Sequence, residues 1–200
     1  MATPRLEFWF EFASTYAYLS AMRIEARAAA HGVEVTWRPF LLGPIFASQG
    51  WETSPFNIYP AKGAYMWRDV ARQARAYGVA FAQPEPFPQH TLQAARVAVA
   101  ALRHPGGTAY CKAIFEAQFA DGKDIADPDT MAGAVRAAGL PDGLVDAAAQ
   151  PEIKDALRIA VAQAQALGIF GAPSFVANGE LFWGDDRLEQ ALEWAVAHPG

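Results

Sequence analysis

Ser14 occupies the point where an apolar run meets a helix-forming run, a position suited to binding an anion. Residues 6–12 are apolar and rich in aromatics, which predicts a buried strand, and the residues after Ser14 favour a helix. The first N–H groups of a helix are free, and the helix dipole is positive at that end. Ser14 can therefore cap the helix, the commonest role for such a serine, or donate a hydrogen bond to a bound thiolate or phosphate. No histidine lies nearby in the sequence to activate it as a nucleophile.

Two stretches near the C-terminus could complete a site around Ser14. In Phe170-Gly-Ala-Pro173-Ser, the proline directly precedes a run that favours a strand. A trans proline is acceptable there, whereas a cis Ala172-Pro173 bond would be uncommon and would need a specific fold context. The stretch Gly184-Asp185-Asp186-Arg187 begins the last helix. One aspartate is enough to cap it, so the second carboxylate could bind the zwitterionic end of a small peptide together with backbone N–H groups.

The elements that would position these residues come from both ends of the chain. Strands are predicted at 6–12 and 33–38 with a helix at 16–31 between them, and the short links make these two strands parallel. A long loop is expected over 41–60, followed by a nearly all-helical block. Asn178-Gly179 predicts a tight hairpin. The remaining elements are strands at 173–177 and 180–183, and helices at about 60–77, 91–102, 108–120, 128–139, 142–149, 151–167 and 187–197.

This order, βαβ, a helical block and then ββα, predicts an α/β thioredoxin-like fold interrupted by an all-α insertion domain. Residues 1–45 and 168–200 would form the thioredoxin-like domain, and residues 46–167 the inserted helical domain. In this fold the turn after the first strand presents the reactive group, and redox members place their first cysteine there. Ser14 takes that position here. The proline before the third strand is typically cis in this fold, and the residue before it offers its backbone to an extended peptide.

The composition excludes several classes of function. The 200 residues are 52% hydrophobic, enough for a sizeable core, and the net charge of −5 without a Lys/Arg-dense block argues against nucleic acid. No apolar run reaches the roughly 18 residues needed to cross a bilayer, and Met1 leads almost directly into the first strand, leaving no room for a signal peptide. Cys111 is the single cysteine, which excludes a C-x-x-C redox pair and, with no cysteine near Ser14, a thiol–disulfide oxidoreductase. We expect a cytoplasmic protein without a metal site.

A set of short motifs along nearly the whole chain points to one family. The motifs are Phe10-Glu-Phe-Ala-Ser14-Thr-Tyr16, Trp37-Arg-Pro-Phe-Leu-Leu-Gly43, Asn57 through Pro60-Ala-Lys62, Tyr65 to Asp69, Phe87-Pro88, Gly168-Ile-Phe-Gly-Ala-Pro173 and Phe182-Trp-Gly-Asp-Asp-Arg187. In this order the chain resembles 2-hydroxychromene-2-carboxylate isomerases and the related kappa-class glutathione transferases, which are thioredoxin-like proteins that use glutathione. The family usually has Ser-Pro-Tyr where this chain has Ser14-Thr15-Tyr16. Threonine is allowed at that position, so we expect the helix start to be retained.

The resemblance implies a glutathione site with Ser14 as the catalytic residue that contacts the glutathione sulfur. Ala172 would pair its backbone with the cysteinyl part of the tripeptide. The other glutathione-binding positions implied by the resemblance are Asn57, Lys62, Pro173, Trp183, Gly184, Asp185 and Asp186, with the two aspartates at the γ-glutamyl end. Because glutathione and a pyruvate-type substrate are anionic, local cations are required, and Lys62, Arg68 and Arg38 are candidates. Ordinary solvated surface is the other reading of these three, and the favoured one for Arg68.

Aromatic side chains are plentiful enough to form a stacking surface for a flat substrate. Phe10, Phe40, Phe46, Tyr65 and Trp67 are candidates, although clusters of this kind more often belong to a core. Cys111, on a helix with apolar neighbours, is expected to be an inert core residue.

The main hypothesis is a glutathione-dependent cis–trans isomerase that acts on a small aromatic enone carboxylate and works as a homodimer, as the family does. The thiolate of the glutathione cofactor, oriented by Ser14, would add to the conjugated double bond, allow rotation and leave again. The alternatives are a glutathione transferase or peroxidase acting on another electrophile, and a non-catalytic thioredoxin-like binding module. Retention of Ser14, Pro173 and Asp186 argues against the binding module.

Overall fold

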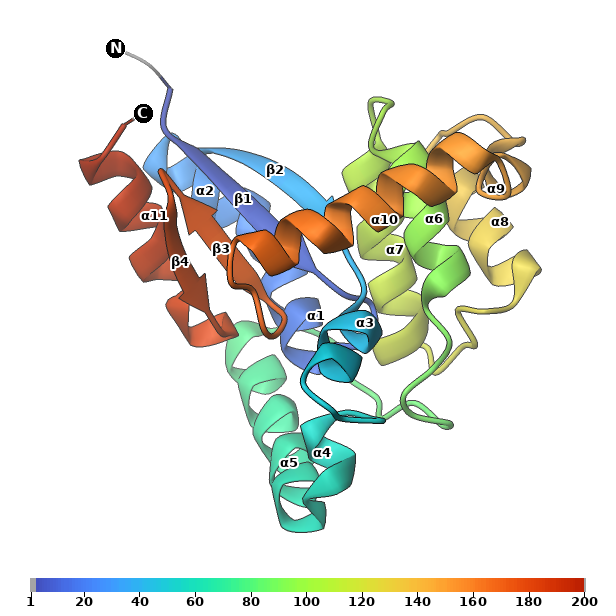
Figure 1. The fold of residues 1–200 in the computed structure, drawn as a ribbon, viewed down its shortest axis with the longest axis horizontal. Coiled ribbons are helices and arrows are strands. Elements are labelled where there is room, and N and C mark those ends of the chain that lie inside the picture. Colours follow the sequence, from blue (N-terminus) through green and yellow to red (C-terminus); the bar gives the residue numbers. More distant parts are fainter. Residues whose placement is uncertain (1–2, 200) are drawn as a thin grey trace.

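A four-stranded mixed sheet built from both ends of the chain forms the centre of the molecule (Figure 1). The computed structural model describes residues 3–199. The strands are β1 (Arg5–Phe10), β2 (Glu34–Pro39), β3 (Ser174–Ala177) and β4 (Glu180–Trp183), in the order β2-β1-β3-β4. β1 and β2 are parallel, as predicted, while β3 is antiparallel to both of its neighbours. β1 is therefore a central strand flanked by one early and one late segment of the chain.

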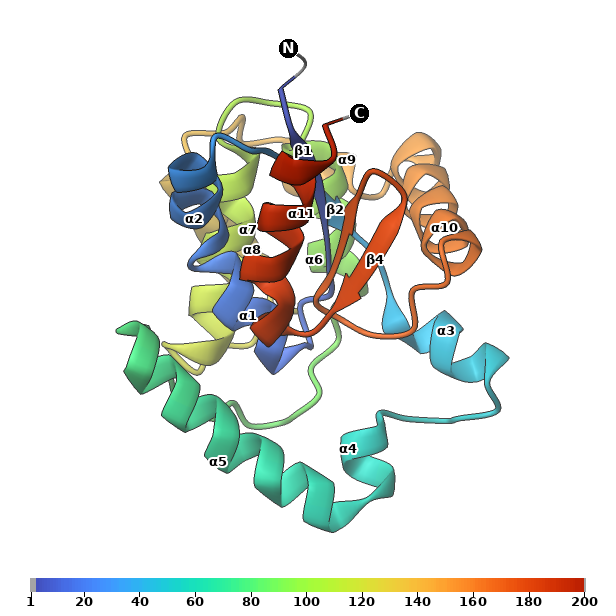
Figure 2. The ribbon, with the colours of Figure 1, turned by 90° about the vertical axis from the view of Figure 1, so that its left-hand side faces the viewer.

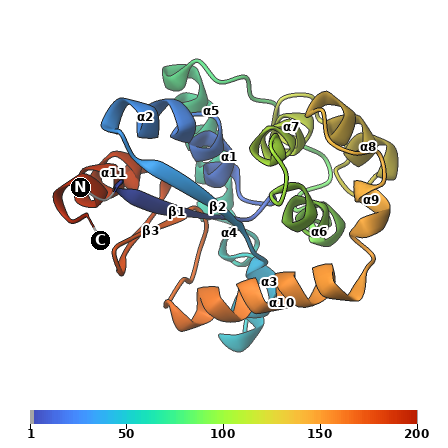
Figure 3. The ribbon, with the colours of Figure 1, turned by 90° about the horizontal axis from the view of Figure 1, so that it is seen from above.

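Both faces of the sheet are covered, which explains why β1 ends in three consecutive buried aromatic residues, Phe8, Trp9 and Phe10. Successive side chains of a strand point to opposite faces. Phe8 and Phe10 belong to the core formed with α1 (Thr15–Ala21), α2 (Ile24–His31) and α11 (Leu188–Ala197). Trp9 belongs to a second core together with residues of α3 (Leu42–Ser48) and α10 (Pro151–Ala166). Figure 3 shows α10 and α3 on the opposite side of the sheet from α1 and α2.

The helix expected over 16–31 is two helices, α1 (Thr15–Ala21) and α2 (Ile24–His31). The N–H of Arg23 donates to the carbonyl of Ser20, three residues back, at 3.0 Å. This tighter turn interrupts the four-residue hydrogen-bonding pattern of a continuous helix. Propensity gave no sign of the break, because Met22 and Arg23 are both good helix formers. Gly32 ends α2 in the left-handed conformation.

The stretch 41–60 is not the long loop expected from its prolines and glycines. It contains α3 (Leu42–Ser48) and α4 (Pro55–Ile58), which lead into α5 (Pro60–Tyr77). The prolines help to begin these helices: Ser54 caps α4 by accepting a hydrogen bond from the N–H of Phe56, with Pro55 in the first turn. Figure 2 shows α3, α4 and α5 forming an arc beside the sheet end at which β1 leads into α1.

The helical block packs directly against the sheet. It comprises α6 (Leu92–Ala101), α7 (Gly107–Phe119), α8 (Pro128–Ala137) and α9 (Leu144–Ala147). The ring of Phe115 on α7 lies 4.9 Å from Phe12 and 5.8 Å from Phe10, centroid to centroid. One buried cluster therefore runs from the sheet into the block. The division into 1–45 with 168–200 and an inserted 46–167 remains a proposal about how the chain is organised.

The predicted hairpin at 178–179 and the predicted core position of Cys111 are confirmed. Asn178 and Gly179 have φ angles of 48° and 83°, the left-handed pair that a tight hairpin requires. Asp127 caps α8 by accepting a hydrogen bond from the N–H of Asp129 at 3.0 Å. Thr91 is the residue before α6, but its side chain makes no capping hydrogen bond. Cys111 is fully buried, and this burial raises the pKa of its thiol. Within residues 3–199, no helix combines the length and apolarity needed to cross a membrane.

Candidate functional site

Ser14 caps α1 and joins the two ends of the chain. Its hydroxyl oxygen accepts a hydrogen bond from the N–H of Ala17 at 3.1 Å, so the capping reading is correct. The same hydroxyl donates to the carbonyl oxygen of Ala172 at 2.8 Å, across 158 residues of sequence. The N–H groups of Thr15 and Tyr16, in the first turn of the helix, have no acceptor within that helix. Ser14 thus places a hydroxyl and a helix N-terminus beside the backbone of Ala172.

Pro173 has the geometry expected from the sequence. The Ala172-Pro173 peptide bond is cis, and the carbonyl of Pro173 accepts a hydrogen bond from the N–H of Gly184 at 3.0 Å. Gly184 has a φ of 112°, a conformation that other residues rarely adopt. These contacts bring the predicted residues at 172–173 and 184 to the same end of the sheet as Ser14.

The two aspartates that follow Gly184 have different environments. Asp185 is buried, and its Oδ1 accepts hydrogen bonds from the hydroxyl of Ser20 at 2.7 Å and from the guanidinium of Arg23 at 2.8 Å. The carboxylate of Asp186 is 73% exposed and its Oδ2 lies 3.4 Å from the guanidinium of Arg187. Neither carboxylate caps the last helix, because both lie in a short 3₁₀ turn before it and Arg187 occupies its N-cap. Asp186 is therefore the aspartate available to a ligand.

A cavity of about 1180 Å³ adjoins these residues. Its walls come from the β1–α1 turn, from α3 to α5, from residues 87–92, and from the segments around Ala172 and Gly184. The predicted residues that line it are Ser14, Lys62, Ala172, Pro173, Trp183, Gly184, Asp185 and Asp186. The volume exceeds that of most single small-ligand sites, so it has room for a short peptide and a second small molecule.

Trp183 forms part of the cavity wall by packing on its neighbours. Trp183 is 51% exposed, and its ring centroid lies 4.8 Å from that of Phe170. A Cβ atom at Gly171 would lie only 2.4 Å from the indole nitrogen, so glycine is needed there for the indole to keep this place.

The structure distinguishes among the other predicted residues. Lys62 lines the cavity, and its ammonium lies 5.5 Å from the ring centroid of Phe56. Asn57 does not line the cavity. Its exposed side chain donates a hydrogen bond to the hydroxyl of Thr53. The guanidinium of Arg38 pairs with Glu7 at 2.8 Å on β1. Neither Arg38 nor Arg68 lines the cavity.

The aromatic candidates separate into core and cavity residues. Phe10 and Phe40 are fully buried, and Trp67 packs edge-on against Phe87 at 4.7 Å between ring centroids. Phe46 and Tyr65 line the cavity. Two of the five candidates are therefore placed to contact a substrate.

Among the ionisable residues of the cavity wall that were not singled out from the sequence, two have a raised pKa and lie beside Ser14 in the sequence. Tyr16 donates its hydroxyl to Oδ2 of Asp69 at 3.0 Å, and burial together with this carboxylate raises the pKa of the phenol. Glu11 is buried in the same wall. The sequence does contain one sign of Glu11: it is an acidic residue inside an aromatic run that is expected to be buried. Such a residue is unusual, because burying a charge is costly.

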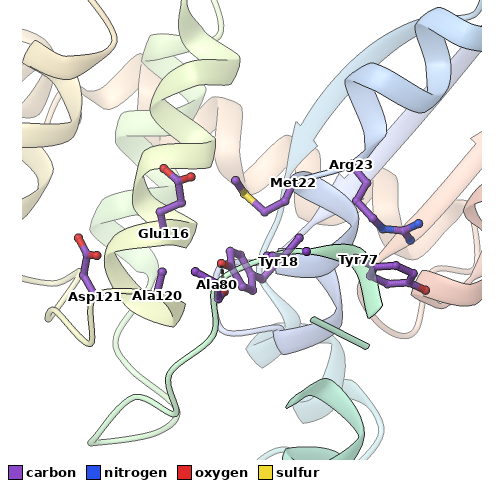
Figure 4. Close-up of a pocket in the computed structure, with 10 residues that line it drawn as sticks. Tyr18, Met22, Arg23, Tyr77, Ala80, Glu116, Ala120 and Asp121 are labelled. Carbon is purple, nitrogen blue, oxygen red and sulfur yellow. Dashed lines mark hydrogen bonds between the residues drawn. The ribbon is translucent and has the colours of Figure 1, made fainter. Parts of the chain in front are cut away.

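A second cavity, of about 440 Å³, lies between α1, the end of α5 and α7 (Figure 4). Arg23 lies on one side of it and Glu116 and Asp121 on the other, while Tyr18 donates a hydrogen bond to the carbonyl of Ala80. None of the predicted site residues line this cavity. In the described part of the chain, no group of three or more His, Cys, Asp or Glu residues could hold a metal ion.

Comparison with known proteins agrees with this geometry. The chain matches the DsbA-like thioredoxin domain over residues 5–194. It is 28% identical over 189 residues to 2-hydroxychromene-2-carboxylate isomerase of Sphingobium xenophagum, covering 94% of this chain and 95% of that one. It is 25% identical over 202 residues to glutathione S-transferase kappa 1 of Homo sapiens, covering 93% of this chain and 88% of that one.

Among solved structures, a 2-hydroxychromene-2-carboxylate isomerase superposes with a TM-score of 0.86 at 20% sequence identity, covering 96% of this chain and 94% of the other. The predicted family resemblance and the thioredoxin-like α/β fold with its helical insertion are confirmed.

Proposed function

Since the chain belongs to the DsbA-like thioredoxin family, we propose that it is a glutathione-dependent isomerase of the 2-hydroxychromene-2-carboxylate type. The proposal rests above all on the bond between the Ser14 hydroxyl and the Ala172 carbonyl in the wall of a large cavity. That bond places a hydroxyl donor and the N-terminus of α1 where redox thioredoxin-like proteins keep a cysteine. A thiol supplied by a cofactor would take the place of the missing cysteine.

The residues of the cavity fit glutathione along its length. The backbone of Ala172 is available to an extended peptide at the cysteinyl position, and Asp186 is exposed toward solvent for an ammonium group. Lys62 lies in the wall formed by α5 and can bind a carboxylate. Asp185 acts by fixing the turn that carries Asp186, because its own carboxylate is occupied by Ser20 and Arg23. Asn57 is the weakest member of the predicted set, since it does not line the cavity.

The helix end and the serine stabilise a thiolate. Free thiols have a pKa of about 8.5, and a helix N-terminus lowers it by favouring the charged form. Ser14 can turn its proton from the Ala172 carbonyl to a sulfur lying over the helix, while its oxygen keeps the bond from Ala17. Bound glutathione would supply the nucleophile that adds to the conjugated double bond of the substrate and leaves after rotation. The protein would orient the thiolate and exclude water.

The substrate we propose is a small aromatic enone carboxylate. Phe46, Tyr65 and Phe87 line the cavity and provide apolar surface for an aromatic ring. A homodimer is part of the same proposal, because the family resemblance that suggests the reaction also suggests it. A cytoplasmic location is proposed as well, because a chain whose single cysteine is Cys111 suits a reducing compartment.

The test is an assay of the purified protein with glutathione and hydroxychromene carboxylate, following the absorbance of the ring-opened product. We expect isomerisation that requires glutathione and does not consume it. Isomerisation at the same rate without glutathione would contradict the mechanism.

A glutathione transferase or peroxidase is the second candidate, favoured by the 25% identity to the kappa transferase along nearly the whole chain. The same thiolate site would serve, but glutathione would be consumed. Conjugation of a model electrophile without isomerisation would support it, and failure to bind millimolar glutathione would leave the non-catalytic binding module.

A further inference from the structure

Glu11 is a buried carboxyl group in the wall of the large cavity, directly beside the turn that carries Ser14. Its side chain and backbone together are 6% exposed. Its Oε1 accepts a hydrogen bond from the N–H of Ala13 at 3.3 Å, and its backbone carbonyl accepts one from the N–H of Ser14 at 3.0 Å. The carboxyl group is therefore fixed to the strand-to-helix turn, and it lines the same cavity as Ser14.

Glu11 has no cationic partner among the described residues, since no ion pair within 3–199 includes it. Burial raises the pKa of its carboxyl group, while the Thr91 hydroxyl and the N–H groups of Ala13 and Phe12 lower it to a smaller extent. The carboxylates and the ammonium on the other cavity walls belong to Glu52, Asp69, Asp185, Asp186 and Lys62. The remaining titratable side chains there are the imidazole of His90 and the phenols of Tyr16, Tyr59, Tyr65 and Tyr77. None of these groups contributes to the raised pKa of the Glu11 carboxyl.

Packing alone does not account for an acid at this position. Phe10, directly before Glu11, and Phe12, directly after it, are fully buried and apolar. Glu7, on β1, is partly exposed and paired with Arg38, the ordinary arrangement for a strand carboxylate. A buried carboxyl without a cation costs stability when it ionises, and residues with perturbed ionisation in a cavity are candidates for proton transfer.

We propose that Glu11 is the proton donor and acceptor of the isomerisation. This inference rests on the proposed function. When the sulfur–carbon bond forms with the thiolate electron pair, the electrons of the conjugated double bond move to the carbonyl oxygen of the substrate, and Glu11 gives its proton to that oxygen. After rotation, the Glu11 carboxylate takes the proton back, the double bond re-forms and the sulfur–carbon bond breaks with its electron pair on sulfur. No other reactant is needed.

The first experiment compares Glu11→Gln with wild type, using Glu7→Gln as the control that removes a nearby carboxylate on β1 that does not line the cavity. Glutamine keeps the size of the side chain and an oxygen for the Ala13 N–H, but it cannot transfer the proton. We expect kcat of Glu11→Gln to fall by about 10²-fold or more, the usual contribution of a positioned acid. The Kd for glutathione, measured by calorimetry, should change less than about threefold, and Glu7→Gln should keep the wild-type kcat.

The second experiment does not depend on activity. Infrared difference spectra, recorded as the pH is raised from 4 to 9, should show the carbonyl stretch of a protonated carboxylic acid that persists above the ordinary range for glutamate and is missing in Glu11→Gln. Loss of the falling alkaline limb of the kcat profile in Glu11→Gln would support the same assignment.

Separate outcomes would overturn the two proposals. If the wild type is active and Glu11→Gln keeps its kcat within about threefold of wild type, only the proposed role of Glu11 is overturned. An infrared spectrum that shows the Glu11 carboxyl ionising near its ordinary pKa would overturn that role as well. A wild type that does not isomerise the substrate with glutathione would overturn the proposed function, and the role of Glu11 with it.

Discussion

At the scale of single residues, Ser14 combines a structural and a proposed catalytic role in one hydroxyl group. Its oxygen caps α1 and its proton is donated to Ala172. Capping uses an acceptor lone pair, whereas stabilising a thiolate uses the donated proton, so the two roles do not compete. Substitutions can therefore separate them.

Ser14→Gly should lose the proposed catalytic role while keeping most of the capping. Glycine is a good N-cap that costs only a few tenths of a kcal/mol relative to serine, whereas alanine costs about 1 kcal/mol. We expect kcat with glutathione to fall by about 10²-fold in both Ser14→Gly and Ser14→Ala, as on removal of one preorganised donor. Urea denaturation should show the larger loss of stability in Ser14→Ala. Ser14→Thr retains the hydroxyl and is the matched control; the mechanism is wrong if it and Ser14→Gly are equally active.

Substitution of Asp185 should lower the stability of the protein, whereas substitution of Asp186 should weaken glutathione binding. Asp185→Ala removes the nearer of the two carboxylates that pair with the largely buried guanidinium of Arg23 and leaves only Glu189, at 3.9 Å, so we expect the free energy of unfolding to fall by about 3 kcal/mol. Asp186→Ala removes an exposed carboxylate and should change stability by less than about 0.5 kcal/mol. The Kd of Asp186→Ala for glutathione should rise by about tenfold, because the variant loses a charge-assisted hydrogen bond to the ligand. Unchanged affinity in Asp186→Ala would exclude it from the binding site.

At the scale of elements, the arc of α4 and α5 forms one wall of the cavity, and its shape depends on close backbone contact. Gly63 in the first turn of α5 is buried, and a Cβ atom there would lie 2.4 Å from the carbonyl oxygen of Phe56 on α4. Phe56, Tyr59 and Lys62 on this wall all line the cavity.

Gly63→Ala should therefore separate α4 from α5. The clash is with backbone, which cannot rotate away, so we expect a loss of about 1–3 kcal/mol in stability and a weaker Kd for glutathione. Gly133→Ala, in the middle of α8, is the matched control because its Cβ would meet nothing within 4 Å. That variant should gain up to about 1 kcal/mol from helix propensity. Thermal unfolding and calorimetry measure both effects; equal behaviour of the two variants would show that the α4–α5 contact is not tight.

Elements with strong local signals were predictable from the sequence, and those determined by tertiary contacts were not. The 178–179 hairpin and the cap at Asp127 follow from residue chemistry that acts within a few positions. The division of α1 from α2 has no such signal. In the 41–60 stretch, prolines that suggested a loop instead begin helices, and Ile45 is buried in a core that only the folded chain forms.

At the scale of the whole molecule, Glu11 links stability to pH. The folded state raises the pKa of its carboxyl from an ordinary value of 4.5, so the native protein binds more protons than the unfolded chain above that pH. The contribution of Glu11 to stability is therefore fully present below about pH 4.5 and is lost as the pH rises through the raised pKa.

Glu11→Gln should remove this dependence. The difference in the free energy of unfolding, variant minus wild type, should become more positive as the pH rises from about 4.5 and level off above the raised pKa. Each unit of elevation contributes about 1.4 kcal/mol. Urea denaturation of both proteins over a pH series measures it, and the subtraction cancels the other titrating groups. A constant difference would show that Glu11 has the same pKa in both states.

Most of the site was predictable because its parts are signalled locally and the fold brings them together. The order of strands and helices placed Ser14, Ala172 and Asp186 at one sheet end. The assignment of Asp185 to an internal ion pair depends on Arg23, which the sequence gave no reason to single out. Glu11 was missed because its meaning comes from burial between elements, which no single stretch of sequence contains.

The position of β1 between β2 and β3 also has a consequence for synthesis. A ribosome produces β1 and β2 first, but the other neighbour of β1 begins only at Ser174. Throughout most of translation, one edge of a Phe- and Trp-rich strand therefore has unpaired backbone groups, a template for unwanted pairing between chains. The nascent protein should depend on chaperone protection until β3 emerges, and a chain stopped before residue 174 should aggregate.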